Sequence, residues 1–273
     1  MNELLRICLI ACPLVFLGGF VDSIAGGGGI ITIPAYLLAG MPTYLALGTN
    51  KLVAMVGTSA ASVKYFRSGK VVLRIAVPAA IGSLLGSLVG TRLALLIPEQ
   101  ALRIVLLVAL PLVAVFLIRK KDFGKNDESD GQKNELKEGE IAALSAESLR
   151  KDILMASVIG LGIGLYDGLI GPGTGTFFIM AFTAAFGTDL LTSSGCAKIA
   201  NLASNVMSAI VYLFAGKVWY LVAVIAMVFN VAGNLAGTRY ALKGGSQNVR
   251  KIMFVVLGLL FVRVILEILG IVS

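Results

Sequence analysis

The chain has 273 residues, of which 58% are hydrophobic and 14% are charged, and its formal net charge is +8. Soluble globular domains are about 45–50% apolar and about 25% charged, and a water-soluble fold of this length cannot bury so much apolar surface. The composition therefore excludes an ordinary soluble enzyme, a disordered chain and a secreted domain, and it favours an all-α polytopic membrane protein.

The first half contains one apolar run, a glycine-rich break and four further apolar pieces. Met1–Gly19 resembles the start of a signal peptide but lacks a small-residue cleavage site, so we interpret it as a retained membrane segment. After the break comes Ile30–Gly40, which is too short to span a bilayer comfortably. Three segments of about the ~20 residues that a bilayer requires then follow. They are Tyr44–Phe66, Val71–Ile97 and Glu99–Ile118.

The same order of pieces recurs after a charged stretch. Residues 119–152 hold eight Lys/Arg and nine Asp/Glu, and we predict a charged cytoplasmic linker there. It separates two membrane domains, residues 1–118 and residues 153–273. The second domain opens with Ile153–Leu169, continues through another glycine-rich break and Thr176–Gly187, and ends with three long segments.

The two halves match in constant register. At an offset of 145 residues the matched pairs are Asp22 and Asp167, Gly26 and Gly171, and Gly28 and Gly173, and at an offset of 147 they are Lys51 and Lys198, and Gly69–Val71 and Gly216–Val218. A string of polar and glycine matches is not expected by chance. Internal repeats in a membrane protein are typical of transporters, which bind their substrates at the repeat interface.

Basic residues indicate how the halves are oriented. In the first half they gather around the loop at Gly69, whereas in the second half they gather one loop later, between Arg239 and Lys251. Basic loops face the cytoplasm, so this displacement by one crossing favours opposite orientations. We therefore predict two inverted repeats of about five helical elements each, with four plus four as the alternative.

The two glycine-rich breaks are candidate substrate sites. They comprise Gly26, Gly27, Gly28 and Gly29 in the first half, and Gly171, Gly173, Thr174 and Gly175 in the second. Unwound backbone is tolerated at membrane depth only against protein or a watery cavity, and the free N–H groups at the start of a helix bind anions. The alternative is close helix packing, which we prefer for Gly82, Gly86 and Gly90 because of their four-residue spacing.

Two lysines lie inside apolar spans, Lys51 and Lys198. A charge at this depth costs at least ~2.5–3.5 kcal/mol on insertion scales, so it usually faces a cavity or a partner. Either the two ammonium groups flank a central anion site, or they form buried ion pairs with Asp22 and Asp167. The two carboxylates are also candidates for proton coupling.

Amide side chains lie close to both lysines in the sequence. Asn50 precedes Lys51, and Asn201 and Asn205 follow Lys198. We expect Asn50 and Asn201 to contact substrate, with Asn205 as a further possible donor. The alternative is that these amides only bond neighbouring helices.

These residues resemble the TauE/SafE family of membrane permeases, also called sulfite exporters. The similarity covers nearly the whole chain and rests on three segments: Gly19–Gly29, Gly48–Lys51 and Tyr166–Gly175. It implies transport of small sulfur-containing anions such as sulfite, thiosulfate and organosulfonates, but members differ and the substrate is not fixed. Thr174 stands where the first break has Gly29, so the two half-sites are not equivalent.

Other residue patterns exclude further classes of function. The chain has no histidine, and Cys8, Cys12 and Cys196 lack metal-site spacing, so we expect no metal and free buried thiols. No phosphate-binding loop is present, so nothing indicates ATP hydrolysis. Basic residues mostly flank apolar runs, and we expect no nucleic-acid partner.

We therefore expect a secondary transporter of the cell membrane that works by alternating access, with no cofactor and no enzymatic activity. The alternative is an anion channel, or a permease for a different small organic anion. The expected partners are the transported anion and membrane lipids, and a homodimer is left open.

Overall fold

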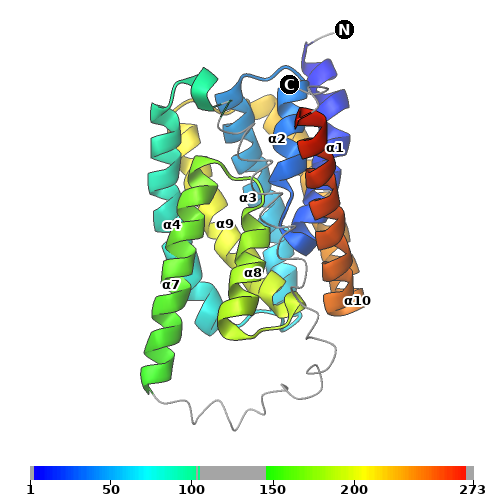
Figure 1. The fold of residues 1–273 in the computed structure, drawn as a ribbon. Coiled ribbons are helices and arrows are strands. Elements are labelled where there is room, and N and C mark those ends of the chain that lie inside the picture. Colours follow the sequence, from blue (N-terminus) through cyan, green and yellow to red (C-terminus); the bar gives the residue numbers. More distant parts are fainter. Residues whose placement is uncertain (1–2, 103, 105–145, 269–273) are drawn as a thin grey trace.

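The computed structural model describes residues 3–102, 104 and 146–268. The described helices are α1 (Glu3–Ala25), α2 (Gly29–Leu38), α3 (Thr43–Arg67), α4 (Leu73–Leu96), α7 (Ala146–Leu169), α8 (Thr174–Phe186), α9 (Leu190–Phe214) and α10 (Tyr220–Ile268) (Figure 1). The described residues contain no strand. Most of the predicted segment Glu99–Ile118 and most of the predicted linker lie outside the described residues.

Helix length and hydropathy confirm the predicted membrane fold. Within the described ranges, five helices are long and apolar enough to cross a bilayer, and they lie in α1, α4, α7, α9 and α10. The two short helices, α2 and α8, have 10 and 13 residues. At 1.5 Å per residue they are about 15 and 20 Å long, well short of the ~30 Å hydrocarbon core.

Each glycine-rich break turns the chain back on itself. Gly26 and Gly171 have φ angles of +76° and +91°, which glycine adopts without strain. Arg6, near the start of α1, donates to the carbonyl oxygen of Ala39 just beyond α2 (3.3 Å), so α1 and α2 form an antiparallel hairpin. Figure 1 shows α7 and α8 forming a second hairpin, with α1 and α7 starting at opposite ends of the bundle.

The tips of the two hairpins meet inside the bundle. The N–H of Gly175 donates to the carbonyl oxygen of Gly26 (3.1 Å), and Oγ1 of Thr176 donates to the carbonyl oxygen of Ala25 (2.7 Å). A Cβ atom on Gly26 would collide with the backbone of Gly175. The broken backbone is thus covered by protein, as membrane depth requires.

Stripes of glycine join the two halves. A Cβ atom at Gly82, Gly86 or Gly90 of α4 would collide with backbone carbonyl oxygens of α7, which confirms their predicted packing role. The same holds for Gly160, Gly164 and Gly168 of α7 against α4, and for Gly233 and Gly237 of α10 against α1. The fourth helix of each half therefore packs along the first helix of the other half.

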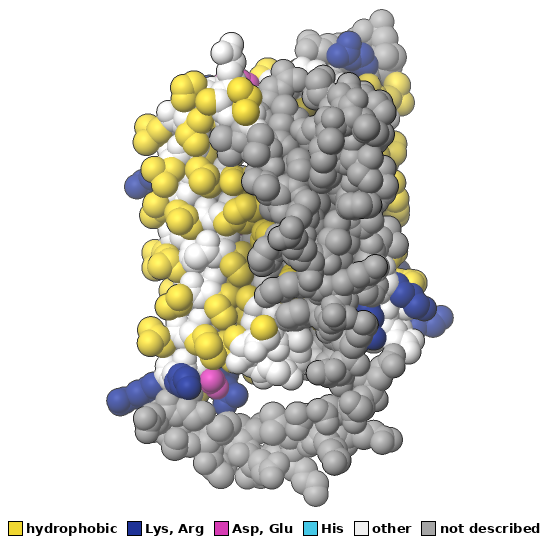
Figure 2. Space-filling model, viewed as in Figure 1, with side chains coloured by type: hydrophobic (Ala, Val, Ile, Leu, Met, Phe, Trp, Pro, Cys, Tyr) yellow, Lys and Arg dark blue, Asp and Glu magenta, His cyan; other side chains and the backbone are white. Residues whose placement is uncertain are grey.

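The outer face of this helix pair is apolar. Figure 2 shows hydrophobic side chains covering the face over α4 and α7, with basic side chains near one end. On α4 the exposed residues are spaced by four: Leu73, Val77, Ile81, Leu85, Val89 and Leu93. An ion pair between Arg74 and Asp152 (3.2 Å) lies where these two helices begin. The face suits contact with lipid.

Two helix boundaries differ from the sequence prediction. The helix α7 begins at Ala146, seven residues before the predicted start at Ile153, because residues 146–152 include good helix formers and continue the helix outward. The helix α10 contains Gly245 with φ of 60° and ψ of −154°, which separates two helical parts. Gly245 matches Pro98 at the 147-residue offset, and α4 ends at Leu96, so both halves break at the same place.

Gly164→Ala and Gly162→Ala form a matched test of the packing between α4 and α7. Gly164 faces the backbone of Ser83, whereas a Cβ atom at Gly162 would meet nothing within 4 Å. We expect Gly164→Ala to lower the free energy of unfolding by ~1–3 kcal/mol through overpacking. Gly162→Ala should leave it unchanged or raise it, because alanine is the better helix former. Thermal unfolding in detergent measures both, and equal stabilities would contradict the close approach of these helices.

Candidate functional site

Two buried ion pairs join the halves at the hairpin tips. Nζ of Lys51 lies 2.7 Å from Oδ2 of Asp167, and Nζ of Lys198 lies 2.8 Å from Oδ2 of Asp22. Each lysine is thus paired with the aspartate of the opposite half. Removing one partner of such a pair leaves an uncompensated buried charge, so the pairs hold the halves in a defined relation.

The ion pairs follow from where the sequence places their members. Lys51 lies near the middle of α3 and Lys198 near the middle of α9, and both side chains are almost completely buried. Asp22 and Asp167 lie in the last turns of α1 and α7, just before the breaks. A helix that ends at mid-depth therefore carries its carboxylate to the level of the opposite lysine.

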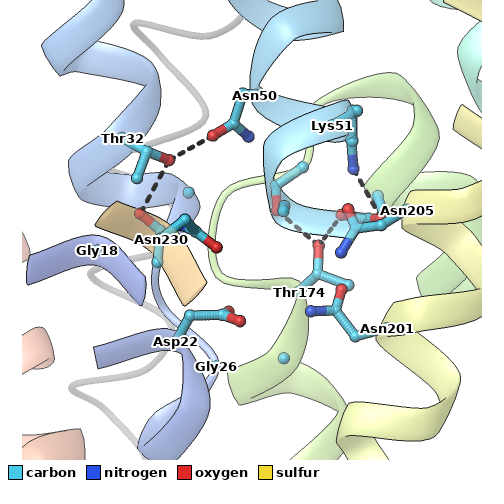
Figure 3. Close-up of a pocket in the computed structure, with 16 residues that line it drawn as sticks. Gly18, Asp22, Gly26, Thr32, Asn50, Lys51, Thr174, Asn201, Asn205 and Asn230 are labelled. Carbon is cyan, nitrogen blue, oxygen red and sulfur yellow. Dashed lines mark hydrogen bonds and ion pairs between the residues drawn. The ribbon is translucent and has the colours of Figure 1, made fainter. Parts of the chain in front are cut away.

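A small cavity lies beside the hairpin tips (Figure 3). It is lined by Gly18, Asp22, Gly26, Gly28, Gly29, Thr32, Asn50, Lys51, Ala54, Asp167, Gly171, Thr174, Gly175, Asn201, Asn205 and Asn230. It offers about 30 Å³ to the centres of water-sized solutes. A water needs ~10–15 Å³ on this measure, so the cavity holds about two waters and suits a compact solute.

The two ion pairs have different surroundings. Oγ1 of Thr174 donates to Oδ1 of Asp167 (2.7 Å), while Oδ2 is ion-paired with Lys51. Asp22 has no such hydroxyl, because Gly29 occupies the position that matches Thr174. The Asp22 side chain is 15% exposed, whereas that of Asp167 is 3% exposed. Asp22 therefore presents a carboxylate to the cavity, and Lys198 lies behind it.

The two short helices begin at the cavity without side-chain caps. The N-cap residues of α2 and α8 are Gly28 and Gly173, and glycine has no side chain that could accept from the first backbone N–H groups. By contrast, Asp189 caps α9 by accepting from two backbone N–H groups. Burial acts to raise the pKa of Asp189, but hydrogen bonds from Thr192 and Ser246 and the charge of Lys70 bring it below its ordinary value. The uncapped starts of α2 and α8 leave positive dipole ends facing the cavity.

Amide side chains complete the lining. Asn50 accepts a hydrogen bond from the hydroxyl of Thr32 (2.6 Å) at Oδ1. Asn230 accepts at Oδ1 from Nδ2 of Asn234 (2.9 Å), which fixes its orientation. Figure 3 shows Asn201 and Asn205 reaching from α9 toward the space beside Thr174.

The structure brings most of the predicted site residues together. Those that line the cavity are Gly26, Gly28, Gly29, Asn50, Lys51, Gly171, Thr174, Gly175 and Asn201, with Asp22 and Asp167. Gly27, Gly173 and Lys198 are not among the lining residues. Lys51 is ion-paired and lines the cavity, whereas Lys198 is ion-paired and is not among the lining residues.

Four lining residues were not expected at the site from the sequence, and Asn205 was expected only as a further donor. The four are Gly18, Thr32, Ala54 and Asn230. Asn205 lies one helical turn after Asn201, and this spacing places both on one face of a helix. Asn230 was missed altogether, although a polar residue in the middle of an apolar run is a usable signal. Gly18, Thr32 and Ala54 carry no comparable signal.

Sequence comparison now decides the family. The sequence profile of the sulfite exporter TauE/SafE family matches residues 11–264. This chain belongs to that family. The family membership expected from the sequence motifs is thereby confirmed. The chain is a multi-pass transporter of the cell membrane.

Individual relatives match this chain over most of their own length. The "Probable membrane transporter protein ORF9" of a Sinorhizobium species is 33% identical over 252 residues, which are 92% of this chain and 90% of that protein. A "Probable membrane transporter protein" of Haemophilus influenzae is 31% identical over 240 residues, 88% of this chain and 87% of its own. "Probable membrane transporter protein YfcA" of Escherichia coli K12 is 30% identical over 249 residues, 89% and 84% of the two chains. No solved structure gives a significant match.

The pair of Lys198 and Asp22 can be tested by a double-mutant cycle. Lys198→Met leaves the carboxylate of Asp22 without its cation, and we expect a loss of ~3–5 kcal/mol in the free energy of unfolding. Adding Asp22→Asn should recover part of this loss, because the neutral amide no longer needs a cation. Thermal unfolding in detergent gives the comparison. A double variant no more stable than Lys198→Met alone would mean that the pair is not the relevant interaction.

Proposed function

We propose that this transporter moves small sulfur-containing anions, such as sulfite, thiosulfate and organosulfonates, across the cell membrane. The observation that carries the proposal is the cavity at the hairpin tips, where Lys51, the uncapped starts of α2 and α8, and several amides converge. Backbone N–H groups, amides and an ammonium group are the donors that oxyanions accept. No enzymatic activity forms part of the proposal.

Binding would change the partners of Lys51. In the structure its ammonium group is neutralised by Asp167 (2.7 Å). An entering anion offers further acceptor oxygens, so the ammonium group can be shared between the anion and the carboxylate. Protonation of Asp167 or Asp22 would favour the anion further, which makes proton coupling one possible energy source, alongside the anion's own gradient.

Alternating access of two inverted repeats is the proposed mechanism. Three observations support it: the halves match in sequence, they exchange helix contacts, and their hairpins enter from opposite ends of the bundle (Figure 1). A substrate held where the tips meet can be exposed to either side when one half rocks against the other. The same site then serves both directions.

Charge distribution favours one orientation in the membrane. One end of the bundle contains the turn from α3 to α4, the start of α7 and the kink of α10. The ion pair of Arg74 and Asp152 joins α4 to α7 at this end, and the hydroxyl of Ser246 at the kink donates to Asp189. Basic residues around these positions are Lys64, Arg67, Lys70, Arg74, Arg150, Lys151, Arg239, Lys243, Arg250 and Lys251. This end is therefore the proposed cytoplasmic side.

Lys51→Ala is expected to reduce sulfite flux strongly. A hydrogen bond to a charged group contributes ~1.5–3 kcal/mol, and tenfold corresponds to ~1.4 kcal/mol, so the initial rate at sub-saturating sulfite should fall about tenfold or more. The assay is uptake into proteoliposomes made with purified protein. Lys217→Ala is the matched control, because Lys217 lies over the ring of Tyr44 (5.5 Å) and is not among the cavity-lining residues. This variant should transport sulfite at the wild-type rate.

Unchanged flux in Lys51→Ala would remove Lys51 from the mechanism. Absence of flux of sulfite, thiosulfate and sulfoacetate in the wild-type protein would contradict the proposed substrate class. A conductance far above transporter rates would indicate a channel instead.

A further inference from the structure

The charged residues of the site are duplicated between the halves, but its amides are not. At the 147-residue offset, Lys51 matches Lys198, and at the 145-residue offset Asp22 matches Asp167. The amides have different residues at their matching positions. Asn50 corresponds to Ala197, Asn201 to Ala54, Asn205 to Thr58 and Asn230 to Ser83. All four amides nevertheless line one cavity.

The positions that match two small lining residues carry larger apolar side chains. Gly18 and Thr32 line the cavity, and at the 145-residue offset they correspond to Ile163 and Phe177. Both of these large side chains pack against the hydrophobic core around α7, α8 and α9. The lining is therefore asymmetric: Gly18 and Thr32 border the cavity, whereas the matching positions carry larger apolar side chains.

Two of the amides lack hydrogen-bond partners within the protein. Asn201 and Asn205 are 5% and 4% exposed, and within the described chain neither side chain forms a hydrogen bond. Polar atoms that face a cavity without a protein partner are free to bond a solute there, and such a hydrogen bond contributes about 0.5–1.5 kcal/mol. Both amides line the same cavity (Figure 3).

We infer that each chain holds one anion off the axis that relates the two halves, and that the amides of Asn201 and Asn205 select it. The inference rests on the proposed function and identifies specificity-determining residues of that site. Lys51 supplies the charge, while Asn201 and Asn205 donate to the oxygens of the anion. Asn230, which Asn234 holds by a hydrogen bond, belongs to the part of the lining that lies opposite α9.

The charge balance explains why neutral donors carry the selection. The two lysines and two aspartates of the ion pairs sum to zero formal charge, and the charged residues that line the cavity are only Lys51, Asp22 and Asp167, so the cavity has no surplus cation to hold an anion tightly. Amide N–H groups add hydrogen bonds in fixed directions without adding charge. Transport also requires that a solute be bound firmly enough to enter and weakly enough to leave.

The test replaces each amide by the residue at its matching position. Asn201→Ala and Asn205→Thr are each expected to weaken sulfite binding several-fold to about tenfold, and to change the ratio of the affinities for sulfite and thiosulfate. Isothermal titration calorimetry on the purified full chain in detergent gives the affinity and the number of anions bound per chain, which should be one. A change in the ratio separates selection from a general loss of structure.

Ser83→Ala is the matched control. Ser83 occupies the position that corresponds to Asn230, is buried and is not among the cavity-lining residues, so its removal should leave both affinities unchanged. Thermal unfolding of every variant shows whether it is folded. Should Asn205→Thr fail to fold, Asn205→Ser and Asn201→Ala provide the same readout.

The outcomes separate this inference from the proposed function. If the wild-type protein binds none of sulfite, thiosulfate and sulfoacetate, the proposed function fails and this inference fails with it. If the wild-type protein binds sulfite but the two asparagine variants keep its affinity and its preference over thiosulfate, only this inference is overturned. Two anions per chain would also overturn it, because the site would then be duplicated.

Discussion

A lysine buried at membrane depth requires a compensating charge, and this protein supplies one to each of its two buried lysines from the opposite half. Asp167 neutralises Lys51, and Asp22 neutralises Lys198. Because both carboxylates lie in the last turn before a glycine-rich break, the pairing also fixes the depth at which α1 and α7 end. The position of the breaks, the meeting of the hairpin tips and the location of the cavity all depend on this constraint.

Glycine makes the meeting of the tips possible. Backbone that leaves a helix inside a bilayer has to find hydrogen bonds within the protein, and at Gly26 it does so with Gly175 of the other half (3.1 Å). A side chain at either position would force the two backbones apart. The uncapped starts of α2 and α8 are then brought next to the two ion pairs, which combines oriented dipoles, backbone donors and a cation in one small volume.

The sequence predicted the repeat, the breaks and most helix ends, because these depend on local patterns. The α3 helix, for example, was expected at Tyr44–Phe66 and occupies Thr43–Arg67. The sequence could not predict which aspartate each lysine contacts. Either lysine could pair with the aspartate of its own half or with that of the opposite half. Lys198 lies outside the cavity lining and Asn230 within it, since those positions depend on how α9 and α10 pack rather than on their own sequences.

The contrast between duplicated charges and unduplicated amides has a physical basis. Each half buries one lysine and one aspartate, so both have to be conserved in kind wherever the duplicated hairpin is kept. A ligand on the axis between the halves would meet the same donors twice, but a pyramidal oxyanion such as sulfite has no two-fold axis and cannot satisfy two equivalent sets. Amides without counterparts at the matching positions, with Ile163 and Phe177 at the positions that match Gly18 and Thr32, suit such a ligand better. In the proposed mechanism, the duplicated hairpins and ion pairs serve the exchange between the two access states, and the unduplicated amides serve recognition of the anion.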